Sequence, residues 1–313
     1  MRIIRQVSEL RPVVSEARRA GDRVGLVPTM GALHEGHLSL MRQARRDCDL
    51  VVASLFVNPA QFNDLGDLQA YPRDEARDAR LAAQVGVDVL FAPPPDAVYP
   101  AGFATTVSIA GLTERLEGVS RGRGHFDGVT TVVTKLLNMV APDVAYFGQK
   151  DAQQVMVIKR LVRDLDLPVQ IAVCPTVREP DGLAMSSRNA HLSPGERRQA
   201  LSVSRSLRVA AAAVADGERD PAAIRRQALE ELAEAGVQPE YFELVSPETF
   251  DPIHKLNASV LAVVAARVGG TRLIDNQMLT TTESSRWREA KGRETSMYGM
   301  NPKSTVEFPG LVA

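Results

Sequence analysis

The sequence predicts an α/β fold in which a doubly wound parallel sheet is followed by a second, smaller α+β domain. Two features of the chain favour this class. Apolar segments rich in Val, Ile and Leu, such as residues 50–57, alternate with segments of helical period at the short spacing of β-α-β units. Polar loops follow several of these segments, at the end where open α/β sheets bind ligands.

The first domain is predicted to comprise residues 1–176. Ser8 is expected to cap its first helix, and Gly21 follows the end of that helix. Further helices are expected near residues 38–47, 73–84, 129–140 and 152–164. Strands are expected at residues 3–4, 24–27, 50–57, 87–92, 105–109, 144–147 and 169–173. Several of these strands are apolar throughout, as in a sheet that helices cover on both faces.

The second domain is predicted to comprise residues 177–280 and to begin in a polar, turn-rich segment. Ser193 and Pro194 form a helix-start signal for a helix that ends near residue 216. A second helix at 221–235 and strands at 241–245, 260–268 and 271–274 complete the predicted unit. The tail, residues 281–313, lacks a clear apolar period, which predicts a segment that is mobile or packs on a partner subunit.

Composition and charge indicate a soluble, cytoplasmic protein. The chain of 313 residues has 44% hydrophobic and 24% charged residues, which is typical of globular domains. A net charge of −1 gives no electrostatic footprint for nucleic acid or an anionic membrane, so neither is expected as a partner. The two cysteines, Cys48 and Cys174, lie far apart and favour a reducing compartment. No apolar segment approaches the ~20 residues that cross a bilayer.

Two histidines lie where the strand at residues 24–27 gives way to a helix. His34 and His37 are three residues apart, so a helix places them on one face. The first turn of that helix also presents unpaired backbone N–H groups, which suits it to hold phosphate. Gly36 lacks a side chain, so a base or ribose could lie against the backbone there. The spacing is not that of the H-E-x-x-H zinc proteases, and an ordinary capped turn is the alternative interpretation.

Three more polar loops are expected to meet the histidine loop at one edge of the sheet, at residues 58–61, 147–154 and 177–188. The four loops together supply two histidines, a lysine, an arginine, serine hydroxyls, an aspartate, neutral amides and backbone N–H groups. Adenylyl transfer needs such a set, because a carboxylate attacking the α-phosphate of ATP is repelled unless cationic donors stabilise the transition state. The sequence contains no P-loop and no compact Ser-His-Asp or Cys-His signature of covalent hydrolases. The glycine-rich segment 118–128 is either a lid over a bound anion or a surface loop.

Six short motifs occur in order along residues 1–280. They are Pro-Thr-Met-Gly-Ala-Leu-His-Glu-Gly-His at 28–37, Phe-Val-Asn-Pro-Ala-Gln-Phe at 56–62, Tyr-Pro-Arg at 71–73, Gly-His-Phe at 124–126, Phe-Gly-Gln-Lys-Asp at 147–151 with Gln154, and Met-Ser-Ser-Arg-Asn at 185–189. In this combination the sequence resembles the pantothenate synthetases (pantoate–β-alanine ligases), a branch of the H-x-G-H adenylyl-transferring superfamily. The resemblance implies a Rossmann-like first domain, a smaller C-terminal domain that carries a mobile Met-Ser-Ser-Arg loop, and a homodimer.

The resemblance also implies roles for individual residues. The catalytic residues would be His34, His37, Lys150 and Arg188, with His37 as proton donor. ATP would contact Met30, Gly31, Ala32, Leu33, His34, Glu35, Gly36, His37, Gly148, Gln149, Lys150, Asp151, Val177, Met185, Ser186, Ser187 and Arg188. Gln61, Gln154 and Asn58 would bind substrate, namely pantoate and, at Gln61, also β-alanine. Asp78 is a candidate ligand of Mg²⁺, although many relatives carry Glu at the position of Gln149, Arg at that of Asp127 and a carboxylate near Arg77.

The implied activity is an ATP-dependent ligation in two steps. Pantoate and ATP would give pantoyl adenylate and pyrophosphate, and the amine of β-alanine would then displace AMP to give pantothenate. ATP is thus expected as a substrate and Mg²⁺ as a cofactor. Two alternatives stay open: a nucleotidyltransferase that adenylylates a phosphate ester, and a regulatory module that binds nucleotide without turnover. The neutral amides of Gln61 and Gln154 favour a hydroxy acid over a phosphorylated partner.

Overall fold

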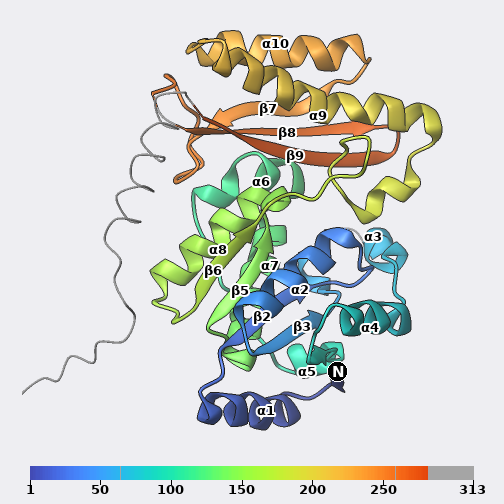
Figure 1. The fold of residues 1–313 in the computed structure, drawn as a ribbon, viewed down its shortest axis with the longest axis vertical. Coiled ribbons are helices and arrows are strands. Elements are labelled where there is room, and N and C mark those ends of the chain that lie inside the picture. Colours follow the sequence, from blue (N-terminus) through green and yellow to red (C-terminus); the bar gives the residue numbers. More distant parts are fainter. Residues whose placement is uncertain (64, 258, 281–313) are drawn as a thin grey trace, which may run out of the picture.

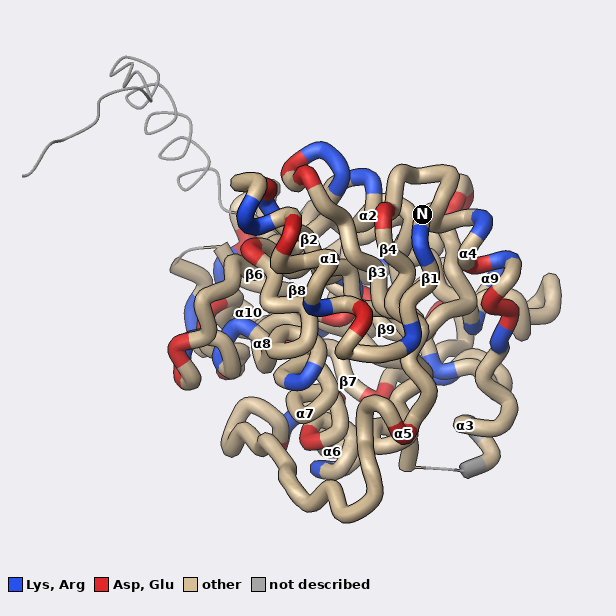
Figure 2. The backbone as a smooth tube through the Cα atoms, turned by 90° about the horizontal axis from the view of Figure 1, so that it is seen from below, with Lys and Arg blue, Asp and Glu red and all other residues tan. Residues whose placement is uncertain are grey.

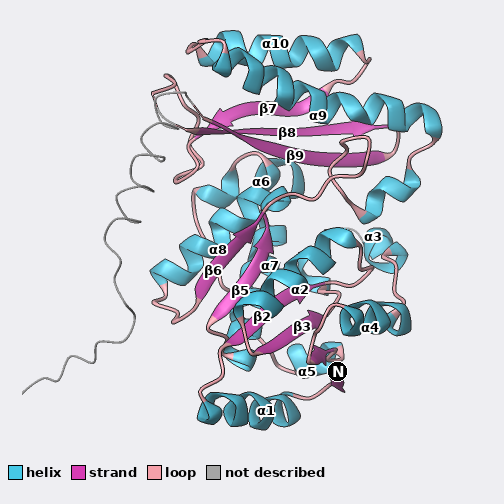
Figure 3. Cartoon of the chain, in the orientation of Figure 1, coloured by secondary structure: helices cyan, strands magenta, loops and turns pink. Residues whose placement is uncertain are grey.

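A computed structural model describes residues 1–63, 65–257 and 259–280 of the chain, and the predicted tail lies outside the described residues. Within this part, the chain forms a six-stranded parallel sheet and then a three-stranded antiparallel sheet. The two sheets lie in different regions of the molecule, each with its own helices (Figures 1 and 3). This arrangement confirms the predicted fold class.

The six-stranded sheet extends in both directions from a central strand, while the first strand of the chain lies at one edge. Its order is β1 (Arg2–Ile4), β4 (Val89–Phe91), β3 (Leu50–Leu55), β2 (Val24–Thr29), β5 (Val144–Gly148) and β6 (Gln170–Cys174). From β2 the chain adds β3 and β4 on one side and then crosses over to add β5 and β6 on the other. The winding therefore reverses between β2 and β5, which is the point where doubly wound sheets bind ligands.

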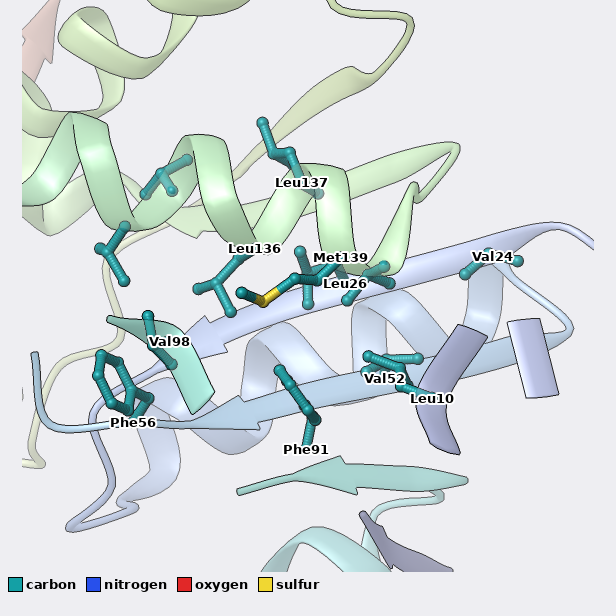
Figure 4. Packing of buried hydrophobic residues seen from close by; sticks show 14 of the residues in the cluster. Leu10, Val24, Leu26, Val52, Phe56, Phe91, Val98, Leu136, Leu137 and Met139 are labelled. Carbon is teal, nitrogen blue, oxygen red and sulfur yellow. The ribbon is translucent and has the colours of Figure 1, made fainter. Parts of the chain in front are cut away.

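Helices cover both faces of this sheet. The described part of the chain up to β6 contains α1 (Val7–Ala20), α2 (Glu35–Asp47), α3 (Leu65–Ala70), α4 (Glu75–Gln84), α5 (Pro95–Val98), α6 (Glu117–Arg121), α7 (Arg123–Val140) and α8 (Ala152–Asp164), with 3₁₀ turns at Pro59–Gln61, Leu112–Glu114 and Gln149–Asp151. Because side chains alternate along a strand, Leu26 and Val52 pack against α1 and α7 (Figure 4), whereas Val27 and Ala53 pack against α2. Burial on both faces explains why these strands are apolar throughout.

The antiparallel sheet consists of β7 (Pro239–Val245), β8 (Val260–Val268) and β9 (Thr271–Leu279) in that order. Helices α9 (Pro194–Ala215) and α10 (Pro221–Glu234) cover one of its faces, and a 3₁₀ turn at Ser187–His191 precedes them. On β8, Ala262 and Val264 pack under these helices, while Leu261 and Val263 join a small cluster with Ala152 of the parallel-sheet part. Both faces of β8 are therefore buried, and this packing connects the two sheets.

Three local predictions in the parallel-sheet part of the chain are wrong. No strand forms at residues 105–109, since the backbone N–H of Val107 donates to Thr131 Oγ1 on α7 at 3.0 Å and its carbonyl accepts from the Thr130 hydroxyl. Helix α7 starts at Arg123, six residues before the position predicted from the apolar period. Helix α1 starts at Val7 after Gln6, which makes no side-chain cap, so Ser8 is inside the helix.

Acidic and basic residues are interspersed along the chain (Figure 2), in keeping with its net charge of −1. No helix in the described part of the chain has the length and apolar character needed to cross a membrane. Cys48 and Cys174 are both buried and both unpaired. Burial raises the pKa of each thiol, which keeps it protonated.

Candidate active site

The loop between β2 and α2 turns sharply at the carboxyl end of the central strand. Gly31 and Ala32 both adopt left-handed backbone conformations, with φ of 88° and 50°. A β-carbon at Gly31 would lie 2.8 Å from Leu55 Cδ1. Only glycine therefore fits without displacing the Leu55 side chain at the end of β3. The turn delivers His34 to the N-cap position of α2.

The carboxylate of Asp78 on α4 binds two backbone N–H groups of this loop. Its Oδ2 accepts the backbone N–H of Ala32 at 2.8 Å, and its Oδ1 accepts that of Leu33 at 2.9 Å. The side chain is 1% exposed, and Arg77 approaches Oδ1 at 3.4 Å. Both oxygens are thus already engaged, and the described residues contain no group of three or more His, Cys, Asp or Glu that could hold a metal ion. The structure therefore does not support Asp78 as a metal ligand; it assigns this carboxylate to the support of the histidine loop.

The two histidines stack at the start of α2. Their ring centroids are 4.1 Å apart at an interplanar angle of 38°. His34 Nδ1 accepts the backbone N–H of Gly36 at 3.1 Å, and His37 Nδ1 accepts that of His34 at 3.3 Å. A β-carbon on Gly36 would lie 2.8 Å from His34 Cε1, so the space left by this glycine holds the His34 ring. The predicted contact of a base or ribose with the backbone at Gly36 stays a prediction.

Both imidazoles are neutral at physiological pH. Burial, assisted by Lys150, lowers the pKa of His34 to about 4, and burial, assisted by His34 and Lys150, lowers that of His37 to about 3. Because each Nδ1 accepts a backbone N–H, the proton of each neutral ring is assigned to Nε2. The pair therefore presents two neutral N–H donors beside the positive end of the α2 dipole.

Lys150 lies across the switch point, in the turn that follows β5. Asn276 of β9 holds this turn, since its Nδ2 donates to the carbonyl oxygens of Gln149 at 2.9 Å and Lys150 at 3.0 Å. The Gln149 side chain donates in turn to Asn276 Oδ1 at 3.1 Å. The neighbouring Asp275, 3% exposed, pairs with Arg178 at 2.6 Å. The antiparallel sheet thus positions a loop of the parallel one.

A cavity of about 240 Å³ opens between these two turns. It brings together most of the residues predicted to form the site: Met30, His34, Gly36, His37, Asn58, Gln61, Gly148, Lys150, Asp151, Gln154, Val177 and Met185. An adjoining cavity of about 110 Å³ shares Met30, Gln61, Lys150, Asp151 and Gln154 and adds Arg188. Ser186 lies with Arg188, Lys150 and Asp151 around a third, small cavity of about 20 Å³.

The remaining predicted residues lie around this site without lining it. Leu33 is buried in the core beside α2, and Glu35 forms an exposed pair with Arg42. Gly31 faces another cavity on the side of α4, and Ala32 shapes the turn. Gln149 faces Asn276. Ser187 starts the 3₁₀ turn that Ser186 caps by accepting the N–H of Arg188 at 3.3 Å.

The glycine-rich segment 118–128 is tied into the protein by an ionic cluster. Glu117 binds both guanidinium nitrogens of Arg272 at 2.8 and 2.6 Å and accepts from Arg121 at 2.9 Å and from the Tyr241 hydroxyl at 2.7 Å. Burial opposes these contacts, yet the cations and hydrogen bonds lower the pKa of Glu117 to about 2. The cluster joins α6 to β7 and β9. Arg121 is therefore already paired within the protein.

Sequence reasoning missed several residues of the cavity wall, among them Thr176 and Tyr71, which have polar side chains. Thr176 lines the cavity, and its buried hydroxyl has no hydrogen-bond partner among the described residues, as expected of a group that meets a ligand. Tyr71, which was quoted only as part of a motif, also lines the cavity. The position of Thr176 could have indicated this role, since it lies two residues after the carboxyl end of β6.

The fold and the cavity define a nucleotide-binding α/β enzyme, because neutral imidazole donors, a helix N-terminus and a lysine meet at the switch point of a doubly wound sheet. The family model described as pantoate-beta-alanine ligase matches residues 2–278. The chain is 52% identical to the pantothenate synthetase of Pelotomaculum thermopropionicum over 280 residues, 89% of this chain and 99% of that one. It is also 52% identical to that of Cereibacter sphaeroides over 274 residues, 88% of this chain and 98% of that one. The chain belongs to the pantoate–beta-alanine ligase family.

Solved structures agree with this assignment. The pantothenate synthetase of Thermus thermophilus is similar with a TM-score of 0.85 at 45% identity, covering 90% of this chain and 100% of that one. The pantoate-beta-alanine ligase of Francisella tularensis, complexed with Beta-gamma ATP and beta-alanine, has a TM-score of 0.73 at 36% identity and covers 89% and 97%. These matches confirm the family, the fold class and the ligase activity predicted from the motifs. They support ligation over adenylylation of a phosphate ester.

Proposed function

We propose that this protein joins pantoate to β-alanine at the expense of ATP, through a pantoyl adenylate formed in the cavity between β2 and β5. The observation that carries the proposal is the meeting of His34, His37 and Lys150 around a cavity whose wall also includes the amides of Gln61 and Gln154. The names of the relatives, and the Francisella structure with Beta-gamma ATP and beta-alanine, support the choice of substrates.

In the first half-reaction, a carboxylate oxygen of pantoate attacks the α-phosphorus of ATP, and the bond to the pyrophosphate oxygen breaks. The two Nε2–H groups and the Lys150 ammonium donate to phosphate oxygens as negative charge builds up in the transition state. With a pKa of about 3, His37 acts as a neutral hydrogen-bond donor and not as an imidazolium acid. The role of this histidine is therefore electrostatic, a narrower role than that of proton donor.

In the second half-reaction, the amine of β-alanine attacks the acyl carbon of the adenylate and releases AMP and a proton. The carboxamides of Gln61 and Gln154 are neutral, so they can hold the oxygens of a hydroxy acid without attracting a second phosphate into the same subsite. The adjoining cavity shares both amides and opens toward Arg188, which gives the second substrate a place beside the first.

In this proposal Mg²⁺ binds together with ATP. Asp151 is the single carboxylate among the described residues of the cavity wall, and these residues form no metal cluster. The phosphates would supply most ligands, with Asp151 as the side chain available to add one. A bound ion would offset the negative charge of the phosphates.

We also infer a domain boundary near residue 177. The buried residues of two hydrophobic clusters lie between Ile4 and Cys174. Those of a separate cluster lie between Leu183 and Leu279. A homodimer and a cytoplasmic location stay predictions from the sequence and from the resemblance.

Isotope exchange between pyrophosphate and ATP tests the proposal. With Mg²⁺ present and β-alanine omitted, exchange should require pantoate, and adding β-alanine should then yield AMP and pantothenate. Lys150→Met should lower the exchange rate by about 100-fold or more, as expected for a lost charged donor to the transition state. Lys159→Met, on the exposed side of α8, is the matched control and should retain it. Exchange that ignores pantoate, or AMP production without an amine, would refute the proposal.

A further inference from the structure

Tyr99 lies behind the cavity wall, just after α5. It is not one of the residues that line the cavity, and its hydroxyl donates to Asn58 Oδ1 at 2.8 Å. Burial raises the pKa of Tyr99 to about 12, so the hydroxyl keeps its proton throughout the physiological range. The residue it reaches, Asn58, is 1% exposed and does line the cavity. Tyr99 thus contacts the site only through another side chain.

The orientation of the Asn58 amide follows from its fixed neighbours. Its Oδ1 lies 3.3 Å from the backbone N–H of Ala60, which can only donate, and its Nδ2 lies 3.1 Å from the carbonyl oxygen of Gly128, which can only accept. The hydroxyl of Tyr99 approaches on the Oδ1 side and strengthens the same orientation. These contacts fix a single orientation of the Asn58 amide.

The oriented Asn58 amide in turn fixes the orientation of the Gln61 carboxamide. Asn58 Nδ2 donates to Gln61 Oε1 at 3.0 Å, so the oxygen of the Gln61 carboxamide is occupied and its Nε2 points away from Asn58. The partner of Nε2 is the sulfur of Met30 at 3.1 Å, and a thioether is a weak acceptor that a substrate oxygen can replace. The cavity therefore receives N–H donors from Gln61.

We propose that Tyr99 is a positioning residue for the hydroxy-acid substrate: through Asn58 it fixes the Gln61 carboxamide so that an N–H donor faces the cavity and selects an acceptor oxygen of pantoate. This inference rests on the proposed function, in which Gln61 holds pantoate. It explains why a tyrosine outside the cavity shares a hydrogen-bond chain with two of its lining amides. A substrate analogue with a hydrogen-bond donor in place of this oxygen would face the N–H donors of Gln61 and could not form the hydrogen bond.

The variant Tyr99→Phe isolates the hydroxyl, because the ring has partners of its own. It packs on Phe103 with centroids 5.1 Å apart and on Phe56 at 6.1 Å, and Lys135 Nζ lies 5.9 Å from its centroid. The phenyl ring of the variant keeps all of these contacts. The melting temperature should therefore stay close to that of the wild type.

Pantoate-dependent exchange between pyrophosphate and ATP gives the first readout. Loss of one hydrogen bond in the chain should raise the KM for pantoate about three- to tenfold in Tyr99→Phe, while kcat and the KM for ATP change less than about twofold. A KM for pantoate equal to that of the wild type would overturn the role of Tyr99 and leave the proposed function standing. Absence of pantoate-dependent exchange in the wild type would overturn the proposed function, and this inference with it.

A double-mutant cycle separates positioning from a general structural effect. Pantoate affinity is measured by calorimetric titration in the wild type, Tyr99→Phe, Gln61→Ala and the double variant. If Tyr99 acts through Gln61, then Tyr99→Phe should weaken binding by less than about twofold in the Gln61→Ala background. Equal losses in both backgrounds would show that Tyr99 does not act through this amide and would overturn the proposal.

Discussion

Asp78→Asn should destabilise the protein and disorganise the histidine loop. The carboxylate accepts two backbone N–H groups, from Ala32 at 2.8 Å and Leu33 at 2.9 Å, at a side chain that is 1% exposed. An asparagine turns an NH₂ group toward one of these donors, so that one buried N–H loses its partner. Losing a charge-assisted hydrogen bond and leaving a buried donor unsatisfied costs about 2–4 kcal/mol. At about 2–4 °C per kcal/mol, the melting temperature should fall by about 5–15 °C.

Calorimetry without metal, followed by pyrophosphate exchange over a range of Mg²⁺ concentrations, tests this reasoning. Asp74→Asn is the matched control, because Asp74 caps the same helix by accepting the Arg77 N–H and asparagine caps as well as aspartate. The loop role predicts a lower melting temperature for Asp78→Asn alone and slow exchange that added Mg²⁺ does not restore. An unchanged melting temperature with a raised Mg²⁺ requirement would show that Asp78 is a metal ligand and that the reasoning is wrong.

Two further predictions concern the histidines. Gly36→Ala should slow exchange at least about tenfold, because the new methyl group meets the His34 ring, while the better helix propensity of alanine keeps the melting temperature level. Gly195→Ala, where the nearest atom is the end of Arg198 at 3.9 Å, is its control, and equal activity in both variants would contradict the packing argument. Stability should also fall on acidification below pH 6.5, because His37 in the unfolded chain takes up a proton at its usual pKa of 6.5 but the folded form does so only near 3. His37→Gln should therefore lose about 2 kcal/mol less than the wild type between pH 7 and pH 5 in urea unfolding, and parallel losses would show that His37 is not held neutral.

The convergence of the site could be predicted because it depends on topology. Residues that follow parallel strands meet at one edge of a sheet, so His34, Gln61 and Lys150 could be placed together from the apolar periods alone. The sheet order that makes β2 and β5 neighbours is consistent with that reasoning. The prediction of elements was wrong where side chains, and not a neighbouring strand, satisfy the backbone hydrogen bonds. Residues 105–109 have the composition of a strand, but threonine side chains on α7 satisfy the backbone of Val107.

Contacts between distant segments were beyond the sequence pattern. β9 was expected to end at Ile274, because Asp275 and Asn276 interrupt its apolar alternation. Both are buried in the strand, at 3% and 4% exposure, since one pairs with Arg178 and the other binds the turn at Lys150. A polar residue inside a strand is read from sequence as a break, but it remains in the strand when a distant partner satisfies it.

The contacts of Asn276 explain why the site needs both sheets. The parallel sheet brings Lys150 to the switch point, but the backbone of that turn has its carbonyl groups bound by Asn276 of β9. Asp275, one residue earlier, binds Arg178 at the start of the segment that carries Met185 and Arg188. Two neighbouring residues of one strand therefore hold the lysine turn and the arginine loop on either side of the nucleotide cavity. Any shift of the antiparallel sheet against the parallel one would move both groups together, which couples the position of that sheet to the shape of the cavity.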